Sequence, residues 1–253
     1  MKITFLGTGT SQGVPVIGCT CEVCRSLDYR DKRLRVSVHL EIDGLSLVID
    51  TGPDFRQQML REHISTLDAV ILTHSHKDHI AGLDDVRAFN YLQKKEMPVY
   101  GSHATLEQVK NEFHYAFTDE KYPGTPLITL HEIDERIFLI QKTEIIPLPV
   151  MHLHMPVMGF RVGDFSYITD ANYIPEKTLA KLKGTRLLVL NALQKEPHLS
   201  HFTLDQAILQ AKCIGATQTY FTHMSHKMGM HHFVGRELPE GIALAYDGLT
   251  INL

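Results

Sequence analysis

The chain has 253 residues, of which 43% are hydrophobic and 21% are charged. This composition is that of a folded globular protein and excludes an intrinsically disordered chain. The formal net charge of -4 at pH 7 gives no general attraction to nucleic acid or to an anionic membrane. No apolar run approaches the roughly 20 residues of a membrane span, and the first residues lack a signal-peptide pattern. We therefore expect a cytoplasmic protein whose cysteines are free thiols or metal ligands rather than disulfides.

Apolar and alternating stretches indicate many strands with helices between them. In chain order, the strand-like segments are 2–7, 36–42, 45–49, 67–73, stretches within 136–150, 157–169, 186–190, 217–222 and two short segments around Asp247-Gly248. The predicted helices cover 55–62, 83–94, 102–116, 175–182 and 204–213. Hairpins come first and helices alternate with strands later, which favours a sheet core with helices outside. No linker or internal repeat interrupts the pattern, so we expect residues 1–253 to form one domain.

Local signals mark several turns and helix starts. The pair Asp43-Gly44 between two alternating stretches is a hairpin signal. Asp54 and Ser102 are expected to cap the helices that follow them, and Thr203 forms a capping box with the residue three positions later. Cys213, alone in the last predicted helix, is expected to be a core residue.

A histidine-rich motif directly follows the apolar stretch 67–73. It reads Thr73-His74-Ser75-His76-Lys77-Asp78-His79. Residues two apart in an extended chain point the same way, so His74 and His76 can bind one metal ion. As the chain turns into a helix, Asp78 and His79 can face a second ion, since imidazoles and carboxylates are ligands that borderline divalent metals prefer. The alternative is a polar turn that is His-rich by chance, and so dense a cluster after a buried strand argues against it.

Further candidate ligands stand where later strands end. They are His152 or His154 after the strand ending at 151, Asp170 after the stretch 157–169, and His223 after 217–222. Each of them alone would be an ordinary loop histidine or capping aspartate. Together with the first motif they supply enough side chains for a pair of metal ions.

The motif and the later ligands, in this order, resemble the metallo-β-lactamase superfamily. The likeness runs from Phe5 to Gly248 and implies an α/β fold, the αββα sandwich of two mixed β-sheets flanked by helices. It implies that one metal ion is held by His74, His76 and His152, that the other is held by Asp78, His79 and His223, and that Asp170 bridges them. His154 stays open as the alternative to His152, which we prefer because it directly follows the apolar strand.

The resemblance also implies the chemistry of the site. Two close divalent ions, zinc or manganese, would lower the pKa of a shared water molecule and hold an anionic oxygen of the substrate. Asp50 resembles a carboxylate that accepts the other ring N–H of a ligand histidine. An ordinary turn aspartate is an equally good interpretation of Asp50. Asp78 is expected to take part in catalysis as well as in metal binding.

Three cysteines, Cys19, Cys21 and Cys24, lie in a polar loop at about 17–26. Three thiolates and one nitrogen satisfy a structural zinc ion, and His226, three residues after His223, is the expected nitrogen. Free thiols gathered by chance are the alternative. With this loop, the sequence resembles the PhnP-like phosphodiesterase branch of the superfamily, and more distantly PqqB-like cofactor-biosynthesis proteins.

His201 precedes the last capped helix at the place where the phosphodiesterase branch has a histidine that acts on the leaving group or on a phosphate oxygen. His198 is the alternative, and a surface histidine without a role is another. We therefore predict a metal-dependent phosphodiesterase that acts on a small phosphodiester, for which a cyclic one is a candidate. The alternatives are a PqqB-like protein without this activity and a tRNA 3′-processing-like nuclease. The acidic balance and the lack of a long flexible arm argue against an RNA substrate, and the resemblance implies a homodimer.

Overall fold

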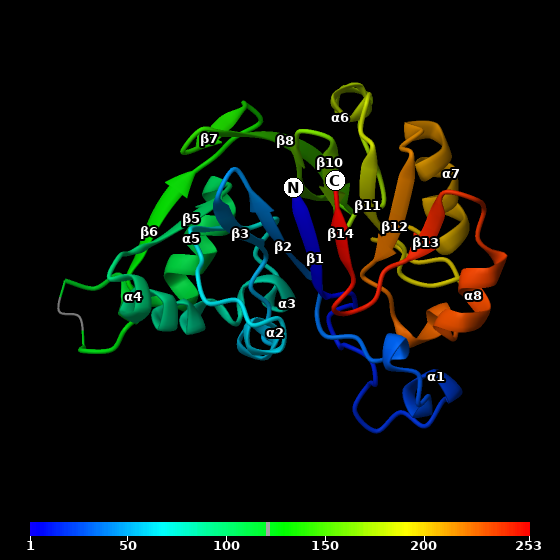
Figure 1. Ribbon diagram of the computed structural model, residues 1–253, viewed down its shortest axis with the longest axis horizontal. Coiled ribbons are helices and arrows are strands. Elements are labelled where there is room, and N and C mark those ends of the chain that lie inside the picture. The colour runs from blue at the N-terminus through cyan, green and yellow to red at the C-terminus, as the bar shows by residue number, and fades with distance from the viewer. Residues whose placement is uncertain (120–121) are drawn as a thin grey trace.

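The computed structural model describes residues 1–119 and 122–253. Figure 1 shows the strands gathered in the middle of the molecule and the helices around them. Within the described ranges the strands form two mixed sheets of seven strands each. The predicted fold class, an α/β sandwich of two mixed sheets flanked by helices, is therefore confirmed.

The first sheet has the strand order β14-β1-β2-β3-β4-β5-β6. Its strands are β1 (Lys2–Gly7), β2 (Ser37–Ile42), β3 (Leu45–Ile49), β4 (Ala69–Ile71), β5 (Met97–Gly101), β6 (Ile128–Glu132) and β14 (Thr250–Asn252). The predicted hairpin forms between β2 and β3, and Asp43 and Gly44 both have positive φ, at 53° and 81°. A two-residue hairpin turn of this kind requires that conformation. Strands β5 and β6 were not predicted from the sequence. Both have five residues, and β5 contains Pro98 and ends at Gly101, which are uncommon in strands.

The second sheet has the order β13-β12-β11-β10-β9-β8-β7. Its strands are β7 (Phe138–Ile140), β8 (Thr143–His152), β9 (Met155–Val162), β10 (Phe165–Ile168), β11 (Leu187–Asn191), β12 (Gln218–Thr222) and β13 (Ile242–Leu244). Strands β10, β11 and β12 are parallel neighbours. Because parallel strands end at the same edge of a sheet, the residues that follow β10 and β12 leave the sheet close together.

The two short strands predicted near the C-terminus lie in different sheets. β13 pairs with β12 in the second sheet, whereas β14 pairs with β1 in the first. The backbone N–H of Leu253 donates to the carbonyl oxygen of Met1 over 2.9 Å, and Figure 1 marks the N and C ends side by side. The end of the chain thus joins the two sheets.

Helices flank the outer faces of the sheets, and α1 projects at the lower edge of the molecule (Figure 1). They are α1 (Glu22–Arg25), α2 (Phe55–Arg61), α3 (Lys77–Ile80), α4 (Arg87–Gln93), α5 (His103–Glu112), α6 (Glu176–Leu182), α7 (Leu204–Ile214) and α8 (His231–Glu237). The helix predicted over 83–94 is divided into a 3-10 turn, Leu83–Val86, and α4. The one predicted over 102–116 likewise ends at Glu112 and is followed by a 3-10 turn, His114–Ala116.

Two predicted caps form and one does not. Ser102 accepts from the backbone N–H of Thr105, and the capping box of Thr203 is present at the start of α7. The carboxylate of Asp54 makes no cap on α2. It accepts instead from the backbone N–H of Arg35 over 2.8 Å and from the guanidinium group of Arg35 over 3.1 Å, because a charge-assisted pair is stronger than a cap with a neutral N–H.

The expectation that Cys213 is a core residue is wrong, since its side chain is exposed. Helix α7 buries a stripe formed by Leu204, Ala207 and Ala211, which recur at the spacing of one helix face. Cys213 lies two positions beyond Ala211, about 200° around the helix, and so faces away from the sheet.

Apolar side chains fill three layers. The central layer lies between the two sheets and includes Phe5, Leu40, Phe160 and Val189. One outer cluster joins the second sheet to α6, α7 and α8, and another joins the first sheet to α2, α4 and α5. The central strands are therefore apolar on both faces, as expected of covered parallel strands. In the described ranges, no helix has the length and apolar character needed to cross a membrane.

Candidate metal centre

The predicted metal ligands come together at the edge where β4, β8, β10 and β12 end. The described residues include three groups whose ligand atoms lie within 4.8 Å of one another: His74, His76 and Asp170; Asp78, His79, Asp170 and His223; and His152, Asp170 and His201. Asp170 belongs to all three. The structure thus assembles all seven side chains that the sequence proposes for a metal pair, together with His201.

Asp170 turns a different oxygen toward each side of this centre. Its Oδ1 atom lies 3.5 Å from Nε2 of His79 and 3.2 Å from Nε2 of His223. Its Oδ2 atom lies 3.8 Å from Nε2 of His74 and 3.2 Å from Nε2 of His201. A carboxylate that bridges two metal ions needs this arrangement, with one oxygen directed at each ligand group.

The donor atoms fit a pair of divalent ions. The Nε2 atoms of His74, His79 and His223 are buried and have no hydrogen-bond partner among the residues that the structure describes. Unpaired buried polar atoms cost free energy, and here they converge on two carboxylates. Bound zinc or manganese would satisfy these atoms, and it would supply an activated water molecule and positive charge beside the substrate.

His152 rather than His154 lies in the centre. The His152 side chain is buried, and its ring centroid is 5.3 Å from that of His76. Its Nδ1–H donates to the carbonyl oxygen of Ser200 over 2.9 Å, which leaves Nε2 free to bind a metal ion. His154 is exposed. Of the two candidates that the sequence leaves open, the structure therefore favours His152.

Asp50 accepts hydrogen bonds from residues of the histidine-rich motif. Its Oδ2 atom accepts from Nδ1–H of His79 over 2.7 Å, and its Oδ1 atom accepts from the backbone N–H of Thr73 over 2.8 Å. A Cβ atom at Gly52 would collide with the carbonyl oxygen of Asp78, so a glycine is needed where this turn meets the motif. The structure thus places Asp50 where the sequence proposes a carboxylate that orients a ligand histidine.

Sequence analysis missed the part that Thr73 plays. The Thr73 hydroxyl donates to Asp50 and lies 3.0 Å from Nδ1 of His74, from which it can accept. It thereby orients the His74 ring and leaves Nε2 directed at the centre. Its position directly before His74 was the available signal, but only the fold shows that Asp50 comes within reach.

The electrostatics of the centre favour the metal-binding forms of Asp170 and His74. Burial by itself raises the pKa of Asp170, but His223 and His79 beside it hold that pKa well below its ordinary value. Burial lowers the pKa of His74 well below its ordinary value. At His79 burial lowers the pKa, but the surrounding carboxylates outweigh burial and raise that pKa well above its ordinary value, so this ring would release a proton on binding a metal ion. Ionised carboxylates and neutral imidazole rings are the forms that bind metal ions.

His201 lies against the centre, and His198 lies outside it. The His201 ring stacks on that of His223, with centroids 4.9 Å apart. Exposed His198 contacts Nδ1 of His201 at 3.3 Å and the backbone N–H of Ser200 at 3.4 Å. Burial lowers the pKa of His201 to about 4. The ring is therefore neutral near pH 7 and carries one N–H to donate.

The cysteine loop forms a second group of ligand atoms. Nδ1 of His226 lies 3.2 Å from Sγ of Cys19 and 3.5 Å from Sγ of both Cys21 and Cys24. Helix α1 lies within this loop, so that Cys24 is on the helix and Cys21 stands directly before it. Three thiols around one imidazole fit a tetrahedral zinc ion. The structure thus brings together the four residues that the sequence proposes for a structural zinc site.

Zinc-depleted protein should be alkylated at Cys21 from about pH 6 upward. The backbone N–H of Cys24 donates to Cys21 Sγ and is the main cause that lowers the pKa of Cys21 to about 6, whereas burial raises the pKa of Cys24 to about 11. Because the thiolate is the reactive form, Cys21 should react with iodoacetamide well below about pH 8.5, the ordinary thiol value. Peptide mapping by mass spectrometry measures each cysteine separately, and added zinc should protect Cys21. A Cys21 rate that rises only near the ordinary thiol pKa would contradict the structure.

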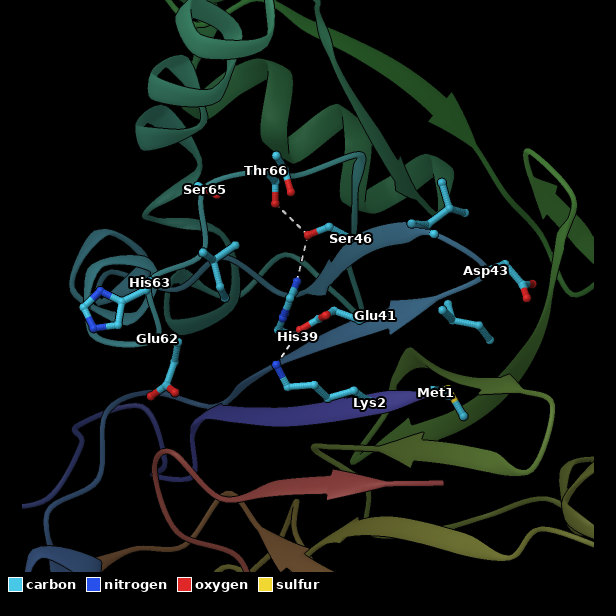
Figure 2. A pocket seen from close by; sticks show the side chains of 14 residues that line it. Met1, Lys2, His39, Glu41, Asp43, Ser46, Glu62, His63, Ser65 and Thr66 are labelled. Atoms are coloured by element: carbon cyan, nitrogen blue, oxygen red, sulfur yellow. Dashed lines mark hydrogen bonds and ion pairs between the residues drawn. The ribbon is translucent and has the colours of Figure 1, made fainter.

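A cavity of about 510 Å³ lies apart from the metal centre (Figure 2). It is bounded by strands β1 to β3 and by the loop that follows α2. Its polar groups largely pair with one another: Lys2 binds Glu41 over 2.7 Å, and His39 binds Ser46 over 2.7 Å. None of the candidate metal ligands lines it, so it forms no part of the proposed site.

Comparison with known proteins agrees with this geometry. The family model described as "Beta-lactamase superfamily domain" matches residues 46–224. A solved structure of a diphosphatase from the PhnP family is 42% identical, covers 99% of this chain and 96% of its own, and has a TM-score of 0.93. An octanoyltransferase from Porphyromonas gingivalis is 40% identical over 252 residues, which are 98% of this chain and 51% of that protein.

More distant relatives share the fold. A ribonuclease Z from Methanococcus maripaludis is 28% identical over 63% of this chain and 48% of its own length. The zinc-bound PqqB structure from Methylobacterium extorquens has a TM-score of 0.81 at 18% identity, with full coverage of both chains. The chain spans about half the length of the curated relatives it matches. From the matched family model and the PhnP-family structure, the chain belongs to the metallo-β-lactamase superfamily, in its PhnP-like branch.

Proposed function

We propose that this protein is a dinuclear metal-dependent phosphodiesterase that acts on a small phosphodiester. The observation that carries the proposal is the position of Asp170, which directs one oxygen to each of two His/Asp groups. In this proposal His74, His76 and His152 hold one ion, Asp78, His79 and His223 hold the other, and Asp170 bridges them. All 253 residues act as one domain, with a structural zinc ion in the cysteine loop.

The side chains of the centre have different roles in this proposal. Asp50 keeps the His79 ring oriented, and Asp78 and Asp170 hold negative charge opposite the metal ions. His201 is neutral near pH 7 because of its lowered pKa, and it donates its N–H to an oxygen of the phosphoryl or leaving group. A bound anionic substrate would raise the pKa of His201 and so favour proton transfer to a departing alkoxide.

A diphosphate ester is the second candidate substrate. It is favoured by the likeness to the PhnP-family diphosphatase, at 42% identity over nearly the whole of both chains. In a diphosphate esterified at both ends, each phosphorus atom carries one negative charge, as in a phosphodiester. The same pair of cations could therefore hold either group. The phosphodiester and the diphosphate ester then differ in their leaving groups.

The other names among the relatives give weaker support. The octanoyltransferase is about twice as long as the region that matches this chain, so its activity cannot be assigned to that region. The ribonuclease Z match covers 63% of this chain, and a sequence pI of about 6.5 gives no general attraction to RNA. The PqqB structure shares the fold at 18% identity.

A substrate panel tests the proposal. Purified protein reconstituted with zinc or manganese should hydrolyse bis(p-nitrophenyl) phosphate much faster than p-nitrophenyl phosphate. A cyclic nucleotide, a doubly esterified diphosphate, a precursor tRNA and an octanoyl thioester complete the panel. Turnover of the diphosphate alone would move the assignment to the second candidate. If the protein hydrolyses no phosphate ester of the panel with either metal, the proposed function is excluded.

Removal of the His201 side chain should act through the leaving group. His201→Ala should slow hydrolysis of an alkyl phosphodiester by about 10²–10⁴-fold, the usual contribution of a positioned proton donor. A nitrophenyl diester should lose much less, since nitrophenoxide departs without a proton. His198→Ala, at the exposed neighbour, is the matched control and should change both rates little. Equal losses on both substrates in His201→Ala would remove the proton-donor role.

A further inference from the structure

We infer that the cysteine cluster, defined as Cys19, Cys21, Cys24 and His226, positions His223 and thereby controls binding of the second metal ion. The inference rests on the proposed dinuclear centre. It concerns the ion assigned to Asp78, His79 and His223, which we name the second ion. The first ion is the one assigned to His74, His76 and His152.

His223 differs from the other buried candidate ligands in how its ring is held. The Nδ1 atom of His79 donates to Asp50 over 2.7 Å, and that of His152 donates to the Ser200 carbonyl over 2.9 Å. Nδ1 of His223 is buried and has no hydrogen-bond partner within the described ranges. Ring orientation in a metal site is normally set by the bond that the second nitrogen makes. For His223 the backbone and the stacking on His201 and His79 must set it instead.

The backbone at His223 is held in an uncommon conformation. Its φ is 57°, in the left-handed region that a non-glycine residue adopts only where its surroundings impose it. The next residue, Met224, is paired on both sides by the N-terminal segment. Its N–H donates to the Thr8 carbonyl over 2.9 Å, and its carbonyl accepts from the N–H of Thr10 over 3.1 Å. The segment that leads into the cysteine loop, from Thr8 to Thr10, therefore lies hydrogen-bonded beside the residue that follows His223.

The cysteine loop returns to the same turn. After Thr10 the chain is anchored by Val14, which exchanges two backbone hydrogen bonds with Arg33 over 2.7 and 2.8 Å. It then carries the three thiols to His226, two residues beyond Met224, at Sγ to Nδ1 distances of 3.2 to 3.5 Å. A zinc ion in the cluster would link the N-terminal loop to His226. The backbone at His223 and Met224 would then belong to a closed loop of the chain. Figure 1 shows the loop with α1 projecting at the lower edge of the molecule.

Loss of zinc from the cluster opens this closed loop. His226 then loses its tether to the thiols, and the turn is held by the bonds of Met224 to Thr8 and Thr10 and by the Ser225 N–H, which donates to the Leu193 carbonyl over 2.8 Å. Within the described residues Nδ1 of His223 makes no hydrogen bond that could compensate, so its Nε2 atom loses its fixed direction toward Asp170. The second ion should then bind about 10- to 100-fold more weakly, which is the usual effect of losing a group that orients a metal ligand. The first ion should keep its affinity, because His74 and His152 are oriented by Thr73 and Ser200.

Cobalt titration of the metal-depleted full chain tests this inference. Thiolate-to-cobalt absorption reports the cluster, and the ligand-field bands of cobalt bound to histidine and carboxylate report the dinuclear centre. His226→Ala and Cys19→Ser break the cluster, and either serves if the other fails to fold. His226→Cys offers a fourth thiolate and is the rescue variant. Cys213→Ser removes an exposed cysteine outside the cluster, and Leu40→Ala destabilises the core between the sheets.

In the cluster variants, the first ion should bind with parental affinity and the second at least about tenfold more weakly. His226→Cys should recover the second ion if it recovers the thiolate signal, and both controls should bind two ions like the parent. Parental affinity for both ions in the cluster variants would overturn the inference and leave the proposed function intact. Equal weakening of both ions, or the same loss in Leu40→Ala, would also overturn it by showing a general effect of stability. A parent that binds no ion pair would overturn the proposed dinuclear centre itself.

Discussion

Replacing Asp170 by asparagine should remove nearly all phosphodiesterase activity and leave the fold intact. Asparagine keeps the size of the side chain but has no charge and presents a nitrogen where one oxygen stood. Both oxygens of Asp170 face candidate ligands, Oδ1 toward His223 and Oδ2 toward His74, so one side of the bridge is lost in either orientation. We expect a fall in kcat/KM on the order of 10³-fold, as when a group that acts on transition-state charge is removed.

Three measurements check this result. The rate is assayed on bis(p-nitrophenyl) phosphate with zinc and with manganese, elemental analysis counts the ions per chain, and a thermal melt reports the fold. Asp164→Asn makes the same change at an exposed carboxylate that pairs with Arg186 on the surface, and it should leave all three measurements near those of the parent. An Asp170→Asn variant with full metal content and parental activity would remove Asp170 from the bridge.

Replacing Cys21 by serine should lower stability strongly. Binding free energy at a structural zinc site is folding free energy, and the three thiols and His226 supply four ligand atoms to one point. We expect a loss of about 3 kcal/mol, the scale of a removed cross-link. For a chain of this length that corresponds to roughly 6–12 °C in melting temperature.

Cys213→Ser is the matched control for this prediction, because Cys213 is exposed on α7. A surface substitution of this kind should stay within about 0.5 kcal/mol of the parent. Elemental analysis after mild chelation should find one retained zinc ion in the parent and in Cys213→Ser, and none in Cys21→Ser. Identical melting of the two cysteine variants would mean that the loop cysteines hold no stabilising ion.

Features that depend on neighbours along the chain could be predicted from the sequence alone. The motif from His74 to His79 stands out because its ligands lie within one turn, and strand and helix geometry fix where such close residues point. The hairpin at Asp43-Gly44 and the capping box at Thr203 form as predicted for the same reason. Asp170 and His223 could be chosen because each follows a strand-like stretch and because they match, in order, the later ligands of the metallo-β-lactamase superfamily.

Residues whose local patterns are alike could be distinguished only in the folded protein. His152 and His154 both end the same stretch, and the choice depends on Ser200, 48 residues from His152, which binds the His152 ring. His201 reaches Asp170, whereas His198 lies outside the centre. Burial among folded segments lowers the pKa of His201 to about 4. Asp54 has a local capping pattern, yet Arg35 from another segment takes its carboxylate. In each case the deciding partner is distant in sequence, and a charge or a buried polar group binds whichever partner the packed sheets bring within reach.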